Sequence, residues 1–151
     1  MTDATFRQLD NGEQRGPGPR IILIGGFQAD EVMLLKEFVD RTFPERIRLR
    51  LCTAQMLDKT LGDALSQPVD DNPAPPDKLP RFLLLSGMSN REIHALINRF
   101  GSTGLPRPLF AATTSANLHF LLRQLLLELL QEHKAMMARR QAQGALNPDE
   151  R

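Results

Sequence analysis

The residues best placed to bind a small anion are Gly25, Gly26 and Phe27, which lie between an apolar run and an amphipathic segment. A glycine turn between a strand and a helix can aim free backbone N–H groups at a phosphate. The sequence contains neither GxGxxG nor GxxxxGK[ST], and Asp30 and Glu31 just beyond the turn would repel a phosphate. A small-ligand or phosphate-binding domain is therefore our alternative function, beside a tight turn that needs glycine for backbone reasons.

The spacing of the histidines and the cysteine gives little support for a metal site or a nucleophilic side chain. His94, His119 and His133 form no HExxH motif and have no cysteine pair to join. Cys52, the only cysteine, falls at the end of an expected strand, where a small buried residue is a simpler interpretation than a thiol nucleophile. We predict no catalytic residue, no metal site and no cofactor, and we favour a protein that is not an enzyme.

Four arginines, Arg20, Arg46, Arg48 and Arg50, could form a basic stripe on an edge strand. No aromatic residue interleaves them, so bases would have little to stack on. The formal net charge of +1 gives no overall field for nucleic acid or an anionic membrane. We expect a solvated strand edge that charge protects from aggregation, and we predict neither nucleic-acid nor membrane partners.

The most informative segment is the Leu-rich stretch from Ser115 to about Arg140, which predicts one long helix. At 1.5 Å per residue the helix would run about 40 Å, whereas a strand of a sheet spans only about 17–20 Å. Its apolar stripe is also wider than one sheet contact needs. We therefore predict a protein-interaction or regulatory module that forms a homodimer, or binds another protein, through this helix; in the alternative, the helix frays after Glu132. The predicted interface residues are Leu121, Leu125, Leu129, Leu130 and Met136.

Strands and helices alternate along the rest of the chain. The runs near 21–25 and 82–86 are apolar on both faces, which is typical of buried central strands. The strands expected near 47–52 and 108–112 would form the edges. Ser89 with Glu92 three residues later predicts a capping box at the start of a helix.

The two halves match when the first is shifted by 61 positions, from Arg20 to Arg81. The matched residues lie in strand cores, at strand-end glycines and along helix seams. We predict an α/β fold in which two βαβα repeats form a four-stranded, mostly parallel sheet of order 2-1-3-4 with helices packed on it. A ferredoxin-like α+β fold, with helices on one face of an antiparallel sheet, is the alternative.

The expected organisation has five parts. They are a disordered N-terminal tail at 1–19, a first repeat at 20–67, a Pro-rich linker at 68–80, a second repeat at 81–140 and a flexible tail at 141–151. The N-terminal segment lacks the apolar stretch of a signal peptide, and no apolar run approaches the roughly 20 residues that cross a bilayer. We expect a cytoplasmic protein.

The second half carries LLLSGMSNREIHALI at 83–97 and PLFAATTSANLHFLLRQLLLELLQE at 108–132. This segment resembles a small bacterial family that is itself a domain of unknown function. That family combines a Glu-bearing helix, a strand ending in Ala-x-Thr and a Leu-rich last helix, and TLGDAL at 60–65 is similar to another of its segments. Its frequent Trp is replaced here by Lys59 or Thr60 and by Phe120. The resemblance implies packing motifs and no catalytic residue.

Overall fold

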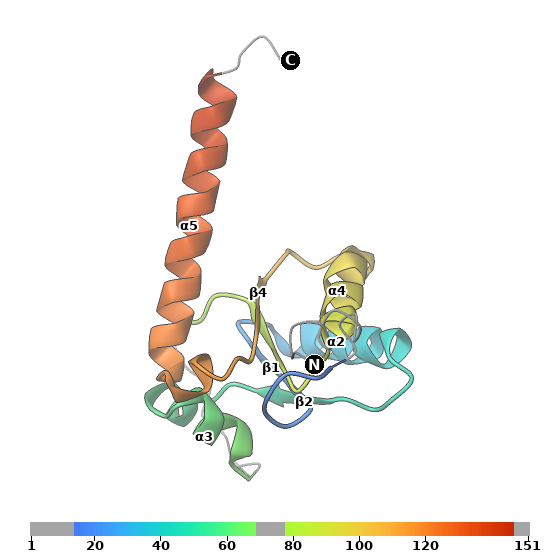
Figure 1. The fold of residues 1–151 in the computed structure, drawn as a ribbon. Coiled ribbons are helices and arrows are strands. Elements are labelled where there is room, and N and C mark those ends of the chain that lie inside the picture. Colours follow the sequence, from blue (N-terminus) through green and yellow to red (C-terminus); the bar gives the residue numbers. More distant parts are fainter. Residues whose placement is uncertain (1–13, 69–77, 147–151) are drawn as a thin grey trace, which may run out of the picture.

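The computed structural model describes residues 14–68 and 78–146. Strands and helices alternate along the chain, and the last helix projects well beyond the rest of the molecule (Figure 1). Short 3-10 turns lie at Gln55–Asp58, Phe100–Thr103 and Asn117–His119. The main elements are β1 (Ile21–Gly25), α2 (Ala29–Thr42), β2 (Arg48–Leu51), α3 (Leu61–Ser66), β3 (Phe82–Ser86), α4 (Asn90–Arg99), β4 (Leu109–Ala112) and α5 (Leu122–Leu146).

The four strands form one sheet in the order β2-β1-β3-β4, which confirms the predicted order and the α/β class. The outer pairs, β1 with β2 and β3 with β4, are parallel. The central pair, β1 with β3, is antiparallel, so the sheet is mixed. The ferredoxin-like alternative is excluded, because the outer pairs are parallel and helices cover both faces of the sheet.

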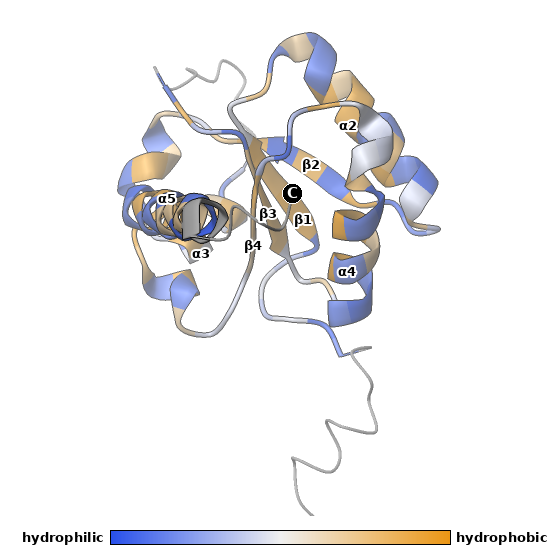
Figure 2. Cartoon of the chain, turned by 90° about the horizontal axis from the view of Figure 1, so that it is seen from above, coloured by the Kyte–Doolittle hydropathy of each residue, from blue (hydrophilic) through white to orange (hydrophobic). Residues whose placement is uncertain are grey.

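The sheet is the middle of three layers. In Figure 2, α2 and α4 lie on one side of it and α3 and α5 on the other. Because both faces are covered, β1 and β3 are buried at every position, which is why their sequences are apolar throughout. The α2 and α4 side holds Ile22, Ile24, Leu83 and Leu85, and the α3 and α5 side holds Ile21, Leu23, Phe82 and Leu84.

Corresponding elements of the two halves lie 61 positions apart. β2 begins at Arg48 and β4 at Leu109, while α3 begins at Leu61 and α5 at Leu122. In the antiparallel centre of the sheet, Leu23 lies opposite Leu84, its own counterpart at that offset. Residues related by the 61-residue offset therefore meet at the centre of the sheet.

Helix α5 starts at Leu122, later than the predicted Ser115, and two backbone hydrogen bonds to the segment before α3 explain this start. The N–H of Leu61 donates to the carbonyl of Phe120 at 2.9 Å, and the N–H of Leu122 donates to the carbonyl of Lys59 at 2.8 Å. These reciprocal bonds hold Phe120 in an extended conformation, so the helix begins only after it. At its other end, α5 continues to Leu146, past the predicted end near residue 140.

Two other predictions concern the segments outside the strands and helices. The Ser89–Glu92 capping box is confirmed, with the Glu92 N–H donating to the Ser89 hydroxyl at 3.2 Å. Residues 14–19 are not a free tail, because the Thr113 hydroxyl donates to the Pro17 carbonyl at 2.6 Å and the Gly16 N–H donates to the Met88 carbonyl at 3.0 Å. The rest of the predicted N-terminal tail (1–13), most of the predicted linker (69–77) and residues 147–151 lie outside the described residues.

Within the described ranges, no helix combines the length and the apolar character needed to cross a membrane.

Candidate functional site

The turn predicted to bind an anion is closed by the chain itself. Gly26 has a φ of +80°, and a Cβ built there would lie 2.4 Å from the carbonyl oxygen of Pro80. A Cβ at Gly25 would lie 2.4 Å from the ring of Phe82. Phe27 lies beside this contact, with the guanidinium of Arg81 5.8 Å from its ring centroid. The glycines are therefore explained by a close approach of the chain on the N-terminal side of β3.

The first turn of α2 already holds an anion of its own, Glu31. One carboxylate oxygen accepts the Gln28 N–H at 2.8 Å, and the other accepts the Arg81 guanidinium at 3.0 Å. These two hydrogen bonds, first from Gln28 and then from Arg81, lower the pKa of Glu31. Because a carboxylate of the chain occupies this helix end, the geometry does not favour a phosphate at Gly25, Gly26 and Phe27.

A second arginine–glutamate pair links the same two halves of the chain. Arg20 donates to the Glu92 carboxylate at 2.8 Å and to the Gly87 carbonyl at 3.0 Å. Glu92 lies 61 positions after Glu31, and Arg81 lies 61 positions after Arg20, so each half supplies one arginine and one glutamate to the other. The hydrogen bond from Arg20 lowers the pKa of Glu92 from 4.5 to about 2. These ionic contacts hold the two halves together.

Replacing Glu92 by Gln should reduce stability at neutral pH and flatten its dependence on acid. Because the folded-state pKa of Glu92 lies below the ordinary value, the Arg20–Glu92 pair contributes fully above about pH 4.5 and is lost as the pH falls toward 2. We expect the variant to be less stable by about 1–2 kcal/mol at pH 7. Urea unfolding at neutral pH and at a series of acidic pH values measures both effects.

The matched control is Asp58→Asn, which removes the exposed ion pair between Asp58 and Arg123. This change should alter the free energy of unfolding by less than about 1 kcal/mol. An E92Q protein whose stability falls with acid as steeply as that of the wild type would contradict the assignment.

The predicted basic stripe is divided between structural roles. Arg50 donates to the Leu65 carbonyl at 2.9 Å in the last turn of α3, where a cation is favoured. Arg20 is held by Glu92, as described above. Two of the four arginines are therefore held by contacts within their own chain.

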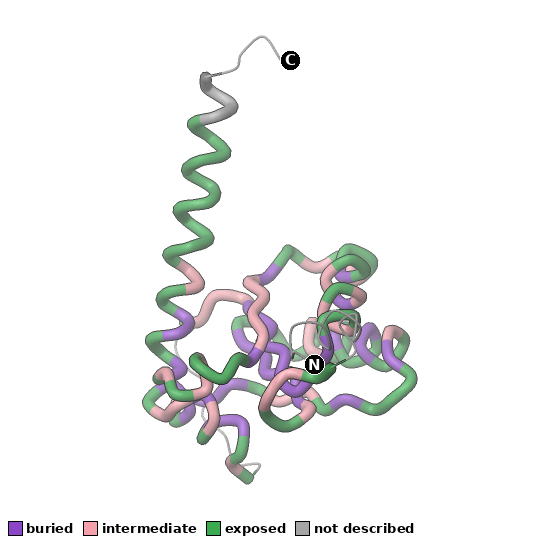
Figure 3. Tube along the Cα trace, in the orientation of Figure 1, coloured by how far each residue is buried: buried purple, intermediate pink, exposed green. Residues whose placement is uncertain are grey.

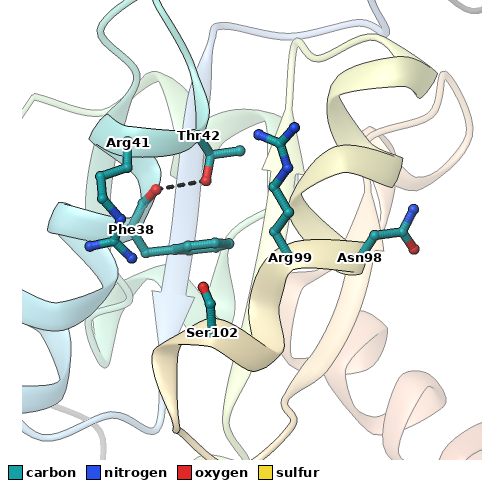
Figure 4. Close-up of a pocket in the computed structure, with 6 residues that line it drawn as sticks. All are labelled: Phe38, Arg41, Thr42, Asn98, Arg99 and Ser102. Carbon is teal, nitrogen blue, oxygen red and sulfur yellow. Dashed lines mark hydrogen bonds between the residues drawn. The ribbon is translucent and has the colours of Figure 1, made fainter.

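A hollow of about 390 Å³ lies between the C-terminal ends of α2 and α4 (Figure 4). Figure 4 shows Arg41 and Arg99 on opposite sides of Phe38, with the Thr42 hydroxyl donating to the Phe38 carbonyl at 2.7 Å. Both arginines lie in the last turn of their helices, where a positive charge complements the helix dipole. The helix ends therefore account for both arginines, and we assign no ligand here. The lining residues are Phe38, Arg41, Thr42, Asn98, Arg99 and Ser102.

The histidines and the cysteine form no reactive group. Among the residues that the structure describes, no three His, Cys, Asp or Glu side chains come together as a metal site. Burial raises the pKa of the Cys52 thiol to about 12, so it stays protonated and weakly nucleophilic at neutral pH.

The C-terminal helix α5 changes environment along its length. Leu122, Leu125 and Leu126 are buried in the core between α5, α3 and the sheet. From Gln131 to Ala142 every residue is exposed, and we call this stretch the overhang; Figure 3 shows it rising clear of the body.

The predicted interface residues fall into three environments. Leu125 belongs to the core of its own chain, so we remove it from the predicted surface. Leu129 and Leu130 are half-buried where α5 leaves the body, while Leu121 and Met136 are exposed. Leu127 and Met137, which belong to the same apolar stretch but not to the predicted interface set, expose 54% and 41% of their surface.

A groove of about 340 Å³ lies between α5 and the edge strand β4. Pro108, Leu109 and Phe110 form its body side, and the Arg107 guanidinium lies 5.3 Å from the Phe110 ring centroid. The helix side combines apolar and charged residues and consists of Leu129, Glu132, His133, Met136, Met137 and Arg140. This surface combines apolar side chains that their own chain leaves open with charged residues of both signs.

Comparison with known proteins bears on the second half of the chain. Residues 81–136 match a family described as a domain of unknown function (DUF3783). This segment is therefore similar to an uncharacterised family, as the resemblance in its sequence implied. No curated protein and no solved structure matches the chain.

Proposed function

We propose that this protein is a non-enzymatic interaction module that forms a homodimer through the overhang of α5. The observation that carries the proposal is the continuous exposure of Gln131–Ala142 together with the apolar side chains of Met136 and Met137, which expose 44% and 41% of their surface. Methionine is flexible and adapts to irregular apolar surfaces, so it suits a contact between proteins.

The overhang would gain stability from a partner. Its twelve residues are all exposed along about 18 Å of helix, so their own chain covers them only in part. Isolated helices of this length are marginal in water, because most helical stability in proteins comes from packing of an apolar face. A second copy would supply that packing, and a two-fold pair lets the same surface serve both partners.

Two further proposals concern the origin and location of the module. We propose that its halves are degenerate copies of one βαβα unit, which the constant 61-residue offset and the reciprocal arginine–glutamate pairs support. A cytoplasmic location and a bacterial source stay predictions from the sequence. Ligand binding at Gly25, Gly26 and Phe27 is not proposed, because Pro80, Phe82 and Glu31 fill that turn.

The test is the oligomeric state of the purified protein over a hundredfold range of concentration. We expect the wild type to approach the mass of a dimer in light scattering as the concentration rises. A double variant, Met136→Asp with Met137→Asp, should remain a monomer and keep its melting temperature, because both side chains lie outside the core.

The matched control changes another pair of adjacent exposed apolar residues. Met33 and Leu34 on α2 expose 68% and 45% of their surface. Replacing both by Asp adds the same charge far from the overhang, and it should leave the dimer intact. A wild-type protein that stays monomeric at the highest concentration would refute the proposed function.

A further inference from the structure

We propose that the two α5 helices pair antiparallel about a two-fold axis at Met136, so that Glu132 of each copy meets Arg140 of the other copy. This inference rests on the proposed function and specifies the geometry of the same surface. It commits to a second copy of this chain as the occupant of the groove beside β4.

The position of the axis follows from the row of side chains that lines the groove. Glu132 and Arg140 lie four residues on either side of Met136, so Met136 is the centre of this row. Before it, Leu122, Leu125 and Leu126 are covered by the body of their own chain. In an antiparallel pair centred on Met136, positions 131 to 141 of the two helices lie against each other, and all of them are exposed in the single chain.

The charges select the antiparallel direction. Glu132, Met136 and Arg140 are spaced four residues apart, so they form one row on the helix, and all three line the groove. In an antiparallel pair about Met136, Glu132 of each copy lies against Arg140 of the other copy, so two attractive charge pairs form. A parallel pair in register would place glutamate against glutamate and arginine against arginine, which is unfavourable.

The groove provides the second wall of the contact. The half-buried residue Leu109 packs on the same side of the sheet as α5, and Pro108 and Phe110 line the groove beside it. A partner helix lying along the row of Glu132, Met136 and Arg140 would cover this apolar wall as well. The contact would therefore bury the part of β4 that its own α5 leaves open.

The extent of the contact predicts its strength. The overhang offers twelve residues per copy, whereas standard stable interfaces use about 20–30 residues on each side. We therefore expect a reversible dimer with a dissociation constant in the micromolar range.

Cysteine cross-linking distinguishes the two directions. With its axis at Met136, the antiparallel dimer brings position 136 against its own counterpart, and M136C should form an intermolecular disulfide. The two copies of position 129 would lie about 21 Å apart along the helices, too far for the roughly 7 Å that a disulfide allows. L129C should therefore stay unlinked. Cys52 is buried and gives a low background.

Charge reversal provides an independent measurement. E132R and R140E should each weaken dimerisation roughly tenfold, because two attractive pairs become repulsive. The double variant E132R/R140E restores opposite charges only in the antiparallel arrangement, so its affinity should return to near that of the wild type. Sedimentation equilibrium gives all four dissociation constants.

The outcomes separate the two proposals. A monomeric wild type refutes the proposed function itself. In a protein that dimerises, any of three results overturns the antiparallel geometry but leaves the proposed interaction module intact. These are disulfides in both the M136C and the L129C variants, no disulfide in the M136C variant, or an E132R/R140E variant that stays weak.

Discussion

Replacing Leu125 by Asp should destabilise the protein strongly, whereas the same change at Leu127 should leave its stability nearly unchanged. Leu125 exposes 5% of its surface in the core beneath α5, while Leu127, two residues later, exposes 54%. An Asp at Leu125 would lose the apolar contacts of the leucine and place a carboxylate among apolar side chains. We expect a loss of at least about 4 kcal/mol, against a total of about 5–15 kcal/mol for a typical domain.

Circular dichroism with thermal and urea unfolding measures this difference. Leu125→Ala provides a graded variant that leaves a cavity without adding a charge, and it should cost about 2–5 kcal/mol. Leu127→Asp is the matched control on the same helix and should shift stability by less than about 0.5 kcal/mol. Equal stability of the two aspartate variants would show that α5 packs on the body by a different face.

Replacing Gly26 by Val should also destabilise the protein strongly. The residue has a φ of +80°, which a β-branched side chain rarely adopts, and a Cβ would lie 2.4 Å from the Pro80 oxygen. The obstacle is backbone, so no side-chain rotation relieves it. We expect a loss of at least about 3 kcal/mol from strain and displacement of the approaching chain.

Gly87→Val should behave in the same way, because a Cβ there would lie 2.7 Å from the Pro19 oxygen at a φ of +66°. The control is Gly101→Val, where a Cβ would meet nothing within 4 Å. Urea midpoints of the three variants give the comparison. If Gly26→Val proved as stable as Gly101→Val, the chain near Pro80 would not approach the turn closely.

The strand order and fold class could be predicted from apolar patterning. Strands apolar on both faces belong in the middle of a covered sheet, and strands such as Arg48–Leu51, in which arginine and leucine alternate, belong at an edge. The direction of the central pair could not be predicted in this way. An apolar run such as Ile21–Ile24 fits a parallel or an antiparallel neighbour equally well, because both leave the same faces covered.

The details of the candidate sites depend on contacts that are remote in sequence. The 61-residue offset showed that Glu31 and Glu92 are equivalent, but only the antiparallel centre brings each to the arginine of the opposite half. Similarly, a glycine turn is the same in sequence whether a ligand or Pro80 lies beside it. Helical periodicity predicted a broad apolar stripe on α5. Which of its leucines are buried depends on the position of the sheet, which buries Leu125 and leaves Leu127 exposed.

The pairing of β1 with β3 and the exchanged arginine–glutamate pairs join the two halves into one unit. A fragment limited to residues 81–136 would leave one long side of β3 with unsatisfied backbone groups, Glu92 without Arg20, and Arg81 without Glu31. Such a fragment would need a second copy of itself to complete its sheet. In the full chain, the first half supplies these contacts within the same polypeptide. They therefore form at any protein concentration, whereas a lone unit would have to bind a second copy to make them.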